Sequence, residues 1–409
     1  MNYRTVMKAC ALFAALPLPL ALPPLVMSGC AAGAAAPSDS PGAPDSGAPK
    51  TTDAGNAPHD SGPSTGSDAG SSGGSSALGP YHTQGAQILD KNNQPHLFRG
   101  LDRPSLEWSC SGDQVETDYI TMHDVWHANV VRLPLNQDCW INDPTNPSYD
   151  SSYEAVVDEQ VGWAKAHGMD IILDLHWSDK GSYSVGQACL QNNTNCQQDM
   201  ADAHSVVFWQ QVATKYKNDP SVLFELYNEP RIGGGNPNAS SWDTWLNGGM
   251  SSGFPVHGMQ ELYDTVRATG ANNLVIIGGL DWSFNLTGLA TNHAVTGTNI
   301  VYNTHVYNQD GESNWYNNFG QFAATYPIIA TEFGDHSGSC SPMINTDFTN
   351  YANGGMVAGN APANKLSWTA WAFYYMASNV CTFPELVNSD QTTPNAMGQV
   401  VQAALIAGP

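Results

Sequence analysis

Basic residues are scarce in this chain. Its 409 residues include 14 Lys and Arg against 37 Asp and Glu, which gives a formal net charge of −23 at pH 7. Such an acidic surface repels nucleic acids and anionic polysaccharides, because both carry negative charge along their length. We therefore expect no nucleic-acid partner, and a neutral molecule is the better prediction for a ligand.

Signatures of cofactor sites are missing as well. Neither a GxGxxG motif nor a Walker loop follows the early apolar runs, which counts against a nucleotide-binding fold. No CxxC pair occurs among the eight cysteines, so zinc binding is the weaker interpretation of these residues. We expect neither a metal nor any other cofactor.

The first 80 residues differ in composition from the rest of the chain. Residues 1–29 contain two basic residues and then a short apolar run broken by prolines, which is typical of a secretory signal and too interrupted for a membrane-spanning helix. The sequence MSGC resembles a bacterial lipobox and predicts a lipid anchor at Cys30. The alternative is an ordinary signal with an incidental cysteine. Residues 30–80 are rich in Ala, Gly, Ser, Pro and Asp and predict a disordered, flexible linker. We expect an exported lipoprotein at the cell envelope or surface, or an extracellular protein.

Six cysteines remain once Cys10 and Cys30 are assigned to the signal and the anchor. In an exported protein they predict up to three disulfides, and the sequence allows about 15 connectivities. Short separation favours Cys189 with Cys196, and the other pairings stay open. The six are Cys110, Cys139, Cys189, Cys196, Cys340 and Cys381.

Residues 81–409 alternate between β-rich apolar runs and amphipathic segments. A short hairpin with an Asn-Asn turn, ILDKNNQPHLFRG, leads into the first of eight strand candidates. Strands that alternate with helices predict a parallel sheet, and nearly continuous apolar runs predict strands covered on both faces. This α/β pattern fits a (β/α)8 TIM barrel better than an open sheet. The strand candidates are 97–101, 128–135, 170–177, 221–228, 274–280, 299–307, 327–333 and 365–373, and the helical segments include 153–168, 204–217, 259–270 and 395–406.

Side chains at the ends of the strand candidates form a chemically coherent set. In such a barrel the carboxyl ends of all strands surround one opening, so residues distant in sequence can share a site. Hydrolysis of a glycosidic bond requires one carboxyl group to protonate the leaving oxygen and another to face the anomeric carbon. Glu229 and Glu332 are the natural pair. The other strand-end residues are Arg132, His176, Trp177, Asn228, His305, Tyr307 and Trp371.

Each of these residues also has a purely structural interpretation. The tryptophans can pack at the barrel rim, the histidines in the core, and Arg132 in an ion pair. Glu225 shares the parity of Glu229 along one strand but lies about 13 Å deeper, at about 3.3 Å per residue. We therefore expect Glu225 to be a buried hydrogen-bonded or arginine-paired group. Three further tryptophans are candidates either for packing or for stacking on sugar: Trp140, Trp242 and Trp282.

Six motifs together resemble glycoside hydrolase family 5, the cellulase-containing family of a clan of retaining (β/α)8 hydrolases. They occur in the order and at the spacing typical of that family, and the resemblance covers residues 81–409. Trp177 is a departure, because many relatives have His or Asn after the equivalent of His176. The motifs are RLPLN at Arg132, ILDLHW ending at Trp177, NEP at Asn228, THVYN at His305, TEFG at Glu332 and SWTAW ending at Trp371.

The resemblance implies a double-displacement mechanism. Glu229 would be the general acid/base and Glu332 the nucleophile that forms a covalent glycosyl-enzyme. Arg132 and Tyr307 would lie close to Glu332 and keep it ionised. The remaining residues would contact the sugar at the cleavage subsite, namely His176, Trp177, Asn228, His305 and Trp371.

The leading expectation is an endo-β-1,4-glucanase that acts on a neutral glucan such as cellulose. Family 5 also includes mannanases, xyloglucanases, β-1,3-glucanases and galactanases, and the sequence does not choose among them. A surface glycan-binding protein without activity is the alternative from another class, and the presence of both glutamates argues against it. A transglycosylase of the same fold is a third possibility. We expect a monomer, tethered to a membrane through Cys30, with a polysaccharide or oligosaccharide as its substrate.

Overall fold

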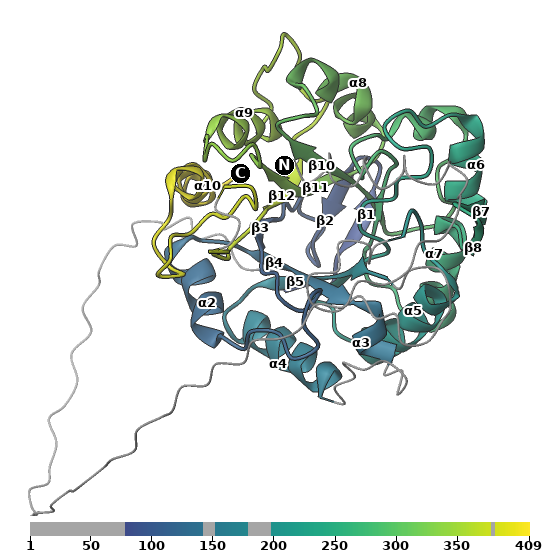
Figure 1. Cartoon of the computed structure of the whole chain (residues 1–409), viewed down its shortest axis with the longest axis horizontal. Coiled ribbons are helices and arrows are strands. Elements are labelled where there is room, and N and C mark those ends of the chain that lie inside the picture. Colours follow the sequence, from purple (N-terminus) through teal and green to yellow (C-terminus); the bar gives the residue numbers. More distant parts are fainter. Residues whose placement is uncertain (1–77, 142–151, 179–197, 378–380) are drawn as a thin grey trace, which may run out of the picture. The chain divides into compact units, whose positions relative to one another are not determined.

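Eight parallel strands close into a barrel, as the sequence predicts. The computed structural model describes residues 78–141, 152–178, 198–377 and 381–409 (Figure 1). Around the barrel the strands follow the order β10, β11, β12, β3, β4, β5, β6 and β9. Their bounds are β3 Arg99–Asp102, β4 Val130–Asn136, β5 Asp170–Trp177, β6 Val222–Glu225, β9 Val275–Gly278, β10 Ile300–Tyr307, β11 Ile328–Gly334 and β12 Ser367–Ala370.

All eight predicted strands overlap observed ones. β5 has the predicted bounds, and most others differ by one to three residues at an end. β6 and β12 each end three residues before the predicted end, β6 at Glu225 and β12 at Ala370. The predicted Asn-Asn turn is present after β2, where Leu89 and Pro95 form an isolated bridge and Asn93 has a φ of 59°.

Helices surround the strands (Figure 1). α5 begins at a capping box, in which the Asp202 carboxylate accepts the Ser205 N–H and the Ser205 hydroxyl accepts the Asp202 N–H. The connection from β9 to β10 departs from the alternating pattern, since its helical content is the 3-10 helix η2. The bounds are α2 Glu116–Ile120, η1 (π-helix) Thr121–Val125, α3 Gln137–Ile141, α4 Tyr153–Ala166, α5 Ala203–Tyr216, α6 Ala239–Asn247, α7 Met259–Ala268, η2 Thr287–Thr291, η3 Glu312–Asn314, α8 Trp315–Asn318, η4 Gly320–Ala324, α9 Met343–Ala352 and α10 Ala396–Ala407.

A hairpin closes the amino-terminal end of the barrel. It consists of β1 (His82–Gln84) and β2 (Gln87–Leu89). Tyr81 and Ile88 pack in one cluster with strand residues such as Val130, Ile172, Leu223 and Ile329. The Tyr81 hydroxyl also donates to Asp170 Oδ2 over 2.5 Å at the start of β5. The opening of the barrel is therefore at the carboxyl ends of the strands. A second hairpin, β7 (Gly249–Ser251) with β8 (Phe254–Val256), lies between α6 and α7.

Two disulfides join loops at the carboxyl ends of neighbouring strands. Cys110, which follows β3, pairs with Cys139 in α3. Cys340, which follows β11, pairs with Cys381 beyond β12. Each bond thus fixes one loop to the next around the barrel opening.

Several predictions fall outside the described residues. These include the signal and lipid anchor in residues 1–29 and at Cys30, most of the linker, and the favoured Cys189–Cys196 pair. In the part of the chain that the structure describes, no helix is long and apolar enough to cross a membrane.

Candidate active site

The barrel brings Glu229 and Glu332 together at the carboxyl ends of its strands. A carboxyl oxygen of each and a ring nitrogen of His305 all lie within 4.8 Å of one another. The two glutamates are almost buried, with 6% and 4% of their surface exposed. Two carboxyl groups thus face each other across a gap of the size that one sugar ring requires in retaining glycosidases, about 5–5.5 Å.

Glu332 is held from two sides. Arg132 Nη1 lies 2.7 Å from Oε1, and the Tyr307 hydroxyl donates to Oε2 over 2.5 Å. Burial and then the charge of Glu332 raise the pKa of Tyr307 well above its usual value, so Tyr307 remains a neutral donor. Because Glu332 accepts a bond at each oxygen, its ionised form is stabilised.

Arg132 is fully buried and contacts three more carboxyl groups. Its Nε lies 2.6 Å from Glu225, its Nη2 2.9 Å from Asp174 and its Nη1 3.2 Å from Asp102. The expectation that Glu225 is a buried, arginine-paired group is confirmed. Sequence reasoning missed Asp102 and Asp174. Asp174 could have been found, because it lies two residues before His176 on β5 and so points to the same side of the strand. Asp102 lies opposite Arg132 on the neighbouring strand β3.

A β-bulge turns Glu332 into the barrel. On β11, Ile329 belongs to the inner cluster and Ala330 to the outer one, so strict alternation would point Glu332 outward. The register with β10 shifts by one residue at Thr331, and this extra residue reverses the parity. Asn303 Oδ1 accepts the Thr331 N–H over 3.0 Å and so satisfies a donor that the bulge takes out of the regular ladder.

A second register shift occurs at His176, between β4 and β5. His176 Nδ1 lies 2.7 Å from Asp174 Oδ2, and its ring stacks on Trp371 with the ring centroids 5.3 Å apart. Its Nε2 lies 3.5 Å from Nδ2 of Asn228. Trp177 is partly exposed as the last residue of β5, and among the described residues its ring forms no aromatic pair with the other site residues. His176 is therefore the residue of this pair that joins the site.

His305 lies between the two carboxyl groups. Its Nδ1 is 3.2 Å from Glu229 Oε1 and 3.4 Å from Glu332 Oε2. Burial lowers the pKa of His305 to about 4, and burial lowers the pKa of His176 to about 4 as well. Both rings are neutral at pH 7. Nε2 of His305 lies 3.1 Å from the Thr331 hydroxyl and 3.3 Å from Asn303 Nδ2, so the ring is fixed from behind while Nδ1 faces both glutamates.

Glu229 does not lie on a regular strand, contrary to the expectation that β6 carries it to the opening. β6 ends at Glu225, although the N–H of Asn228 still donates to the carbonyl of Leu175 over 2.9 Å. Glu229 has a φ of 50°, in the left-handed region that non-glycine residues adopt infrequently. The parity argument that placed Glu225 and Glu229 on one face therefore fails beyond Glu225, and it is this irregular segment that places Glu229 opposite Glu332.

The three additional tryptophans are packing residues. Trp140 is 1% exposed and packs on aromatic rings of α5, and Trp242 is 4% exposed beside Trp245. Trp282 is 4% exposed, and its backbone N–H donates to the carbonyl of Pro230 over 3.1 Å. Trp140 and Trp242 thus pack against other aromatic rings, and in the described residues neither contacts a strand-end residue of the site through its ring.

Sequence reasoning missed a partly exposed aromatic group beside Trp371. Phe383 lies 5.7 Å from Trp371 between ring centroids, and Trp108 lies 5.5 Å from Tyr374 and 6.2 Å from Phe383. These residues follow β3 and β12. No strand-end pattern indicates Phe383, because it lies in a loop well beyond β12.

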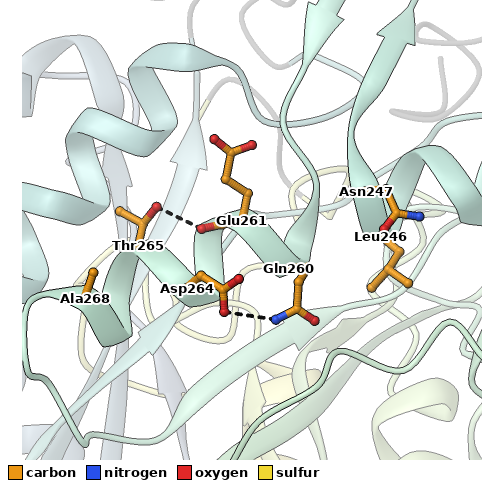
Figure 2. A pocket seen from close by; sticks show the side chains of 7 residues that line it. All are labelled: Leu246, Asn247, Gln260, Glu261, Asp264, Thr265 and Ala268. Carbon is orange, nitrogen blue, oxygen red and sulfur yellow. Dashed lines mark hydrogen bonds between the residues drawn. The ribbon is translucent and has the colours of Figure 1, made fainter.

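A separate depression of about 460 Å³ lies on the outer helices, at the end of α6 and along α7 (Figure 2). Two of its lining side chains bond within α7: Gln260 donates to Asp264 over 3.0 Å and Thr265 to the Glu261 carbonyl over 2.8 Å. None of the strand-end residues lines it. The chemistry described above therefore belongs to the barrel opening and not to this depression.

Comparison with known proteins identifies relatives of this chain. The model of the family described as "Cellulase (glycosyl hydrolase family 5)" matches residues 89–376. An endoglucanase of Paenibacillus polymyxa is 25% identical over 291 residues, which cover 62% of this chain and 66% of that protein. An endoglucanase of Clostridium saccharobutylicum is 24% identical over 304 residues, with 72% of this chain and 57% of that protein covered. The chain thus spans about three fifths of the length of these relatives.

Solved structures show the same fold. The β-glucanase SdGluc5_26A from Saccharophagus degradans has a TM-score of 0.57 and 21% identity, with 80% of this chain and 93% of that chain covered. That protein has also been solved in complex with cellotetraose. At this identity the likeness concerns the fold alone.

Proposed function

Since the chain belongs to glycosyl hydrolase family 5, we propose that it cleaves a neutral β-1,4-glucan internally, as an endoglucanase that retains the anomeric configuration. The separation of Glu229 and Glu332 carries this proposal, because a carboxyl oxygen of each lies within 4.8 Å of the other. Inverting enzymes hold the two groups about 6.5–9.5 Å apart to leave room for a water molecule. The two bacterial relatives are named endoglucanases, which supports glucan as the polymer.

In the first step, Glu332 attacks the anomeric carbon while the bond from that carbon to the leaving oxygen breaks. Glu229 gives its proton to the leaving oxygen, so the first sugar product departs as a neutral alcohol. Glu332 is then a glycosyl ester and Glu229 a carboxylate. Arg132 and Tyr307 hold Glu332 ionised and oriented before the attack.

In the second step, a water molecule gives a proton to Glu229 and its oxygen attacks the anomeric carbon. The ester bond breaks, and the electron pair returns to Glu332 as a carboxylate. Asn228 accepts from Arg132 over 2.9 Å through Oδ1, which orients its amide group. We assign the Asn228 amide to the sugar 2-hydroxyl, where a bond that strengthens in the transition state raises the rate. We assign the stacked rings of His176 and Trp371 to the wall of the cleavage subsite.

The stereochemistry of the first product tests the mechanism. With a β-1,4-gluco-oligosaccharide as the substrate, proton NMR during the first turnovers should show the β-anomer at the new reducing end. The α-anomer should appear only later, through mutarotation. If the α-anomer forms first, the enzyme inverts and Glu332 is not a nucleophile.

A panel of polymers tests the substrate. Carboxyl-free β-1,4-glucan, β-1,3-glucan, mannan, xyloglucan and galactan are compared by release of reducing sugar, and viscosity measured in parallel separates internal from terminal cleavage. We expect the largest kcat/KM on β-1,4-glucan with an early fall in viscosity. Activity on another polymer and on no glucan would replace the proposed specificity with that of another family 5 enzyme.

The alternative of a glycan-binding protein without activity has its own test. Glu332→Ala should abolish product formation and leave glycan binding in place if the chain is an enzyme. If the parent and Glu332→Ala bind glycan equally and neither releases sugar, the binding function is the correct one.

We also propose that the protein is exported and anchored to a membrane through a lipid on Cys30. The signal-like residues 1–29 and the MSGC sequence support this proposal. Expression of the full chain in a bacterium with a labelled fatty acid should label the parent and not Cys30→Ser. Equal labelling of the two proteins would refute the anchor.

A further inference from the structure

One buried guanidinium faces four carboxyl groups in the barrel. Arg132 contacts Asp102, Asp174, Glu225 and Glu332, and the first three have side chains with no exposed surface. The two nearby imidazoles do not add positive charge, because burial lowers the pKa of each to about 4. Four ionised carboxylates around one cation would leave a large excess of negative charge away from water, which is strongly unfavourable.

The carboxyl groups differ in how well their negative charge is stabilised. Glu225 accepts from Arg132 at both oxygens and also from Asn303 and Thr331, each at 2.8 Å. Glu332 accepts from Arg132 and Tyr307. Asp174 Oδ2 is contacted by Arg132 Nη2 at 2.9 Å and by His176 Nδ1 at 2.7 Å. Each of these three carboxyl groups thus has at least one partner besides Arg132.

Asp102 is the least stabilised of the four. Its single contact is with Arg132 Nη1 at 3.2 Å, the longest of the four ion-pair distances, and that nitrogen also serves Glu332 at 2.7 Å. Among the described residues, the second oxygen of Asp102 has no hydrogen-bond partner. A buried hydroxyl without a partner is less unfavourable than a buried carboxylate that has one long ion pair and a second oxygen without a donor.

We propose that Asp102 is a positioning residue that keeps a proton while the enzyme works, so that the charge of Arg132 acts on Glu332. The proposal rests on the proposed function, in which Glu332 must be ionised to attack. Asp102 contacts Nη1 as a neutral acid and does not compete with Glu332 for the charge of Arg132.

The surroundings of Asp102 support its neutral form. Burial raises its pKa well above the usual range; the contact with Arg132 opposes that rise, and the nearby charges of Glu332 and Glu225 add to it. The groups that face Asp102 are Arg132 from β4, Glu225 from β6, Tyr307 from β10 and Glu332 from β11. Two of these four are carboxyl groups, Tyr307 is a neutral phenol, and the one cation is shared among all the carboxyl groups.

Infrared spectroscopy of the full chain tests the proposal directly. The difference spectrum between the parent and Asp102→Asn at pH 7 should contain the carbonyl band of a protonated carboxylic acid, lost in the variant. A lost carboxylate band would overturn the proposal. Asp102→Leu, which removes the carboxyl without adding a donor, is measured in the same way and keeps the test available if the Asn variant does not fold.

The pH dependence of activity gives a second test. Asp102→Asn should leave the acid limb of kcat/KM within about 0.3 pH units of the parent, because no charge is removed near Glu332. If Asp102 is ionised, the substitution removes a negative charge, and the acid limb moves down by about one pH unit or more. A residue with only a packing role would not produce that shift.

Stability gives a third test that does not need substrate. A buried Asp with a raised pKa favours folding below the unfolded pKa, near 4, and this contribution is lost as pH rises towards the pKa in the fold. The folding constant of Asp102→Asn relative to the parent should therefore rise about tenfold per pH unit above about pH 4. A fall with pH would mean that Asp102 is ionised. If no polysaccharide is cleaved, the proposed function fails, and the infrared and stability measurements still decide the state of Asp102.

Discussion

The two glutamates reach the barrel opening in different ways. β11 continues as a strand through Glu332, and a bulge at Thr331 turns the side chain inward. β6 stops at Glu225, and Glu229 follows on an irregular segment with a φ of 50°. Glu332 is thus positioned by a strand with a bulge, and Glu229 by an irregular segment that follows the end of a strand.

The difference matches the roles proposed for the two groups. A nucleophile must remain ionised and aimed at one carbon, and Glu332 has Arg132 on one oxygen and Tyr307 on the other. A general acid/base must give a proton and then take one back. Glu229 contacts His305, a neutral ring that faces both glutamates. Arg132 therefore contacts Glu332, and the imidazole of His305 contacts Glu229.

The largest effect is expected from removal of Glu332. Glu332→Ala should lower kcat by more than about 10⁴-fold on every substrate, because no ester can form and the remaining groups cannot replace the attack. Kinetics on an oligosaccharide and on an aryl β-cellobioside measure this. If the variant keeps a substantial rate with either substrate, Glu332 is not the nucleophile.

Removal of Glu229 should be substrate-dependent. Glu229→Ala should lower kcat about 10²–10⁴-fold on a polysaccharide, because proton donation to the leaving oxygen is lost. With an aryl β-cellobioside whose phenol is a good leaving group, the first step should stay fast, and phenol should appear in a burst. Azide should then restore turnover and yield the β-glycosyl azide. Equal losses on both substrates would show that Glu229 is not the acid/base.

The bulge is tested at Asn303. Asn303→Ala removes the acceptor for the Thr331 N–H and a donor to Glu225, so Glu332 loses its support. We expect kcat to fall about 10²-fold with little change in KM, the cost of a misplacement near 1 Å. Asn299→Ala is the matched control, because Asn299 bonds to Asn272 at the other end of the barrel wall. It should lower stability and leave kcat unchanged. If kcat falls by a similar factor in the control, the loss in Asn303→Ala does not come from the bulge.

A smaller loss is expected at Tyr307. Tyr307→Phe keeps the ring and removes the hydroxyl that donates to Glu332 over 2.5 Å. Bonds to charged groups contribute about 1.5–3 kcal/mol, and the part that changes between ground and transition state should lower kcat roughly tenfold. Steady-state kinetics on a β-1,4-gluco-oligosaccharide measure this loss. An unchanged kcat would mean that the Tyr307 hydroxyl does not support Glu332 in the reaction.

The last effect concerns His305 and appears in stability and not in rate. Its pKa is lowered to about 4 in the fold from an ordinary value of 6.5. The unfolded chain therefore binds the proton first as pH falls, and His305 costs stability progressively from about pH 6.5 to 4, by about 3 kcal/mol in total. His305→Gln removes this titration. Denaturant unfolding across that range should show the parent losing stability faster than the variant. Parallel curves would mean that the pKa of His305 is the same in the folded and unfolded chain.

Much of the fold could be predicted because apolar runs and amphipathic segments report burial directly. Glu229, Glu332 and Arg132 could be found because they end such runs. The bulges at Thr331 and His176 could not, since an extra residue in a strand has no signature of its own. Alternation alone points Glu332 away from the site it occupies.

Other features were out of reach for different reasons. The early end of β6 depends on hydrogen bonds to neighbouring strands that apolar composition does not specify. The pairings Cys110–Cys139 and Cys340–Cys381 depend on which loops lie next to each other at the barrel opening. The spacing of cysteines in the sequence does not predict which loops these are. Burial of the tryptophans follows from packing among helices, which a single sequence position does not reveal.

Both of these disulfides tie rim loops to one another, and neither passes through the eight-stranded wall. A thiol reductant in an assay buffer should therefore act on the entrance for the polymer while the barrel persists. Protein prepared in a reducing cytosol would have the same barrel as protein prepared in an oxidising compartment. The two preparations would differ in the loops that bind the polysaccharide. A difference in activity between such preparations would therefore reflect disulfide formation in these loops as well as catalysis.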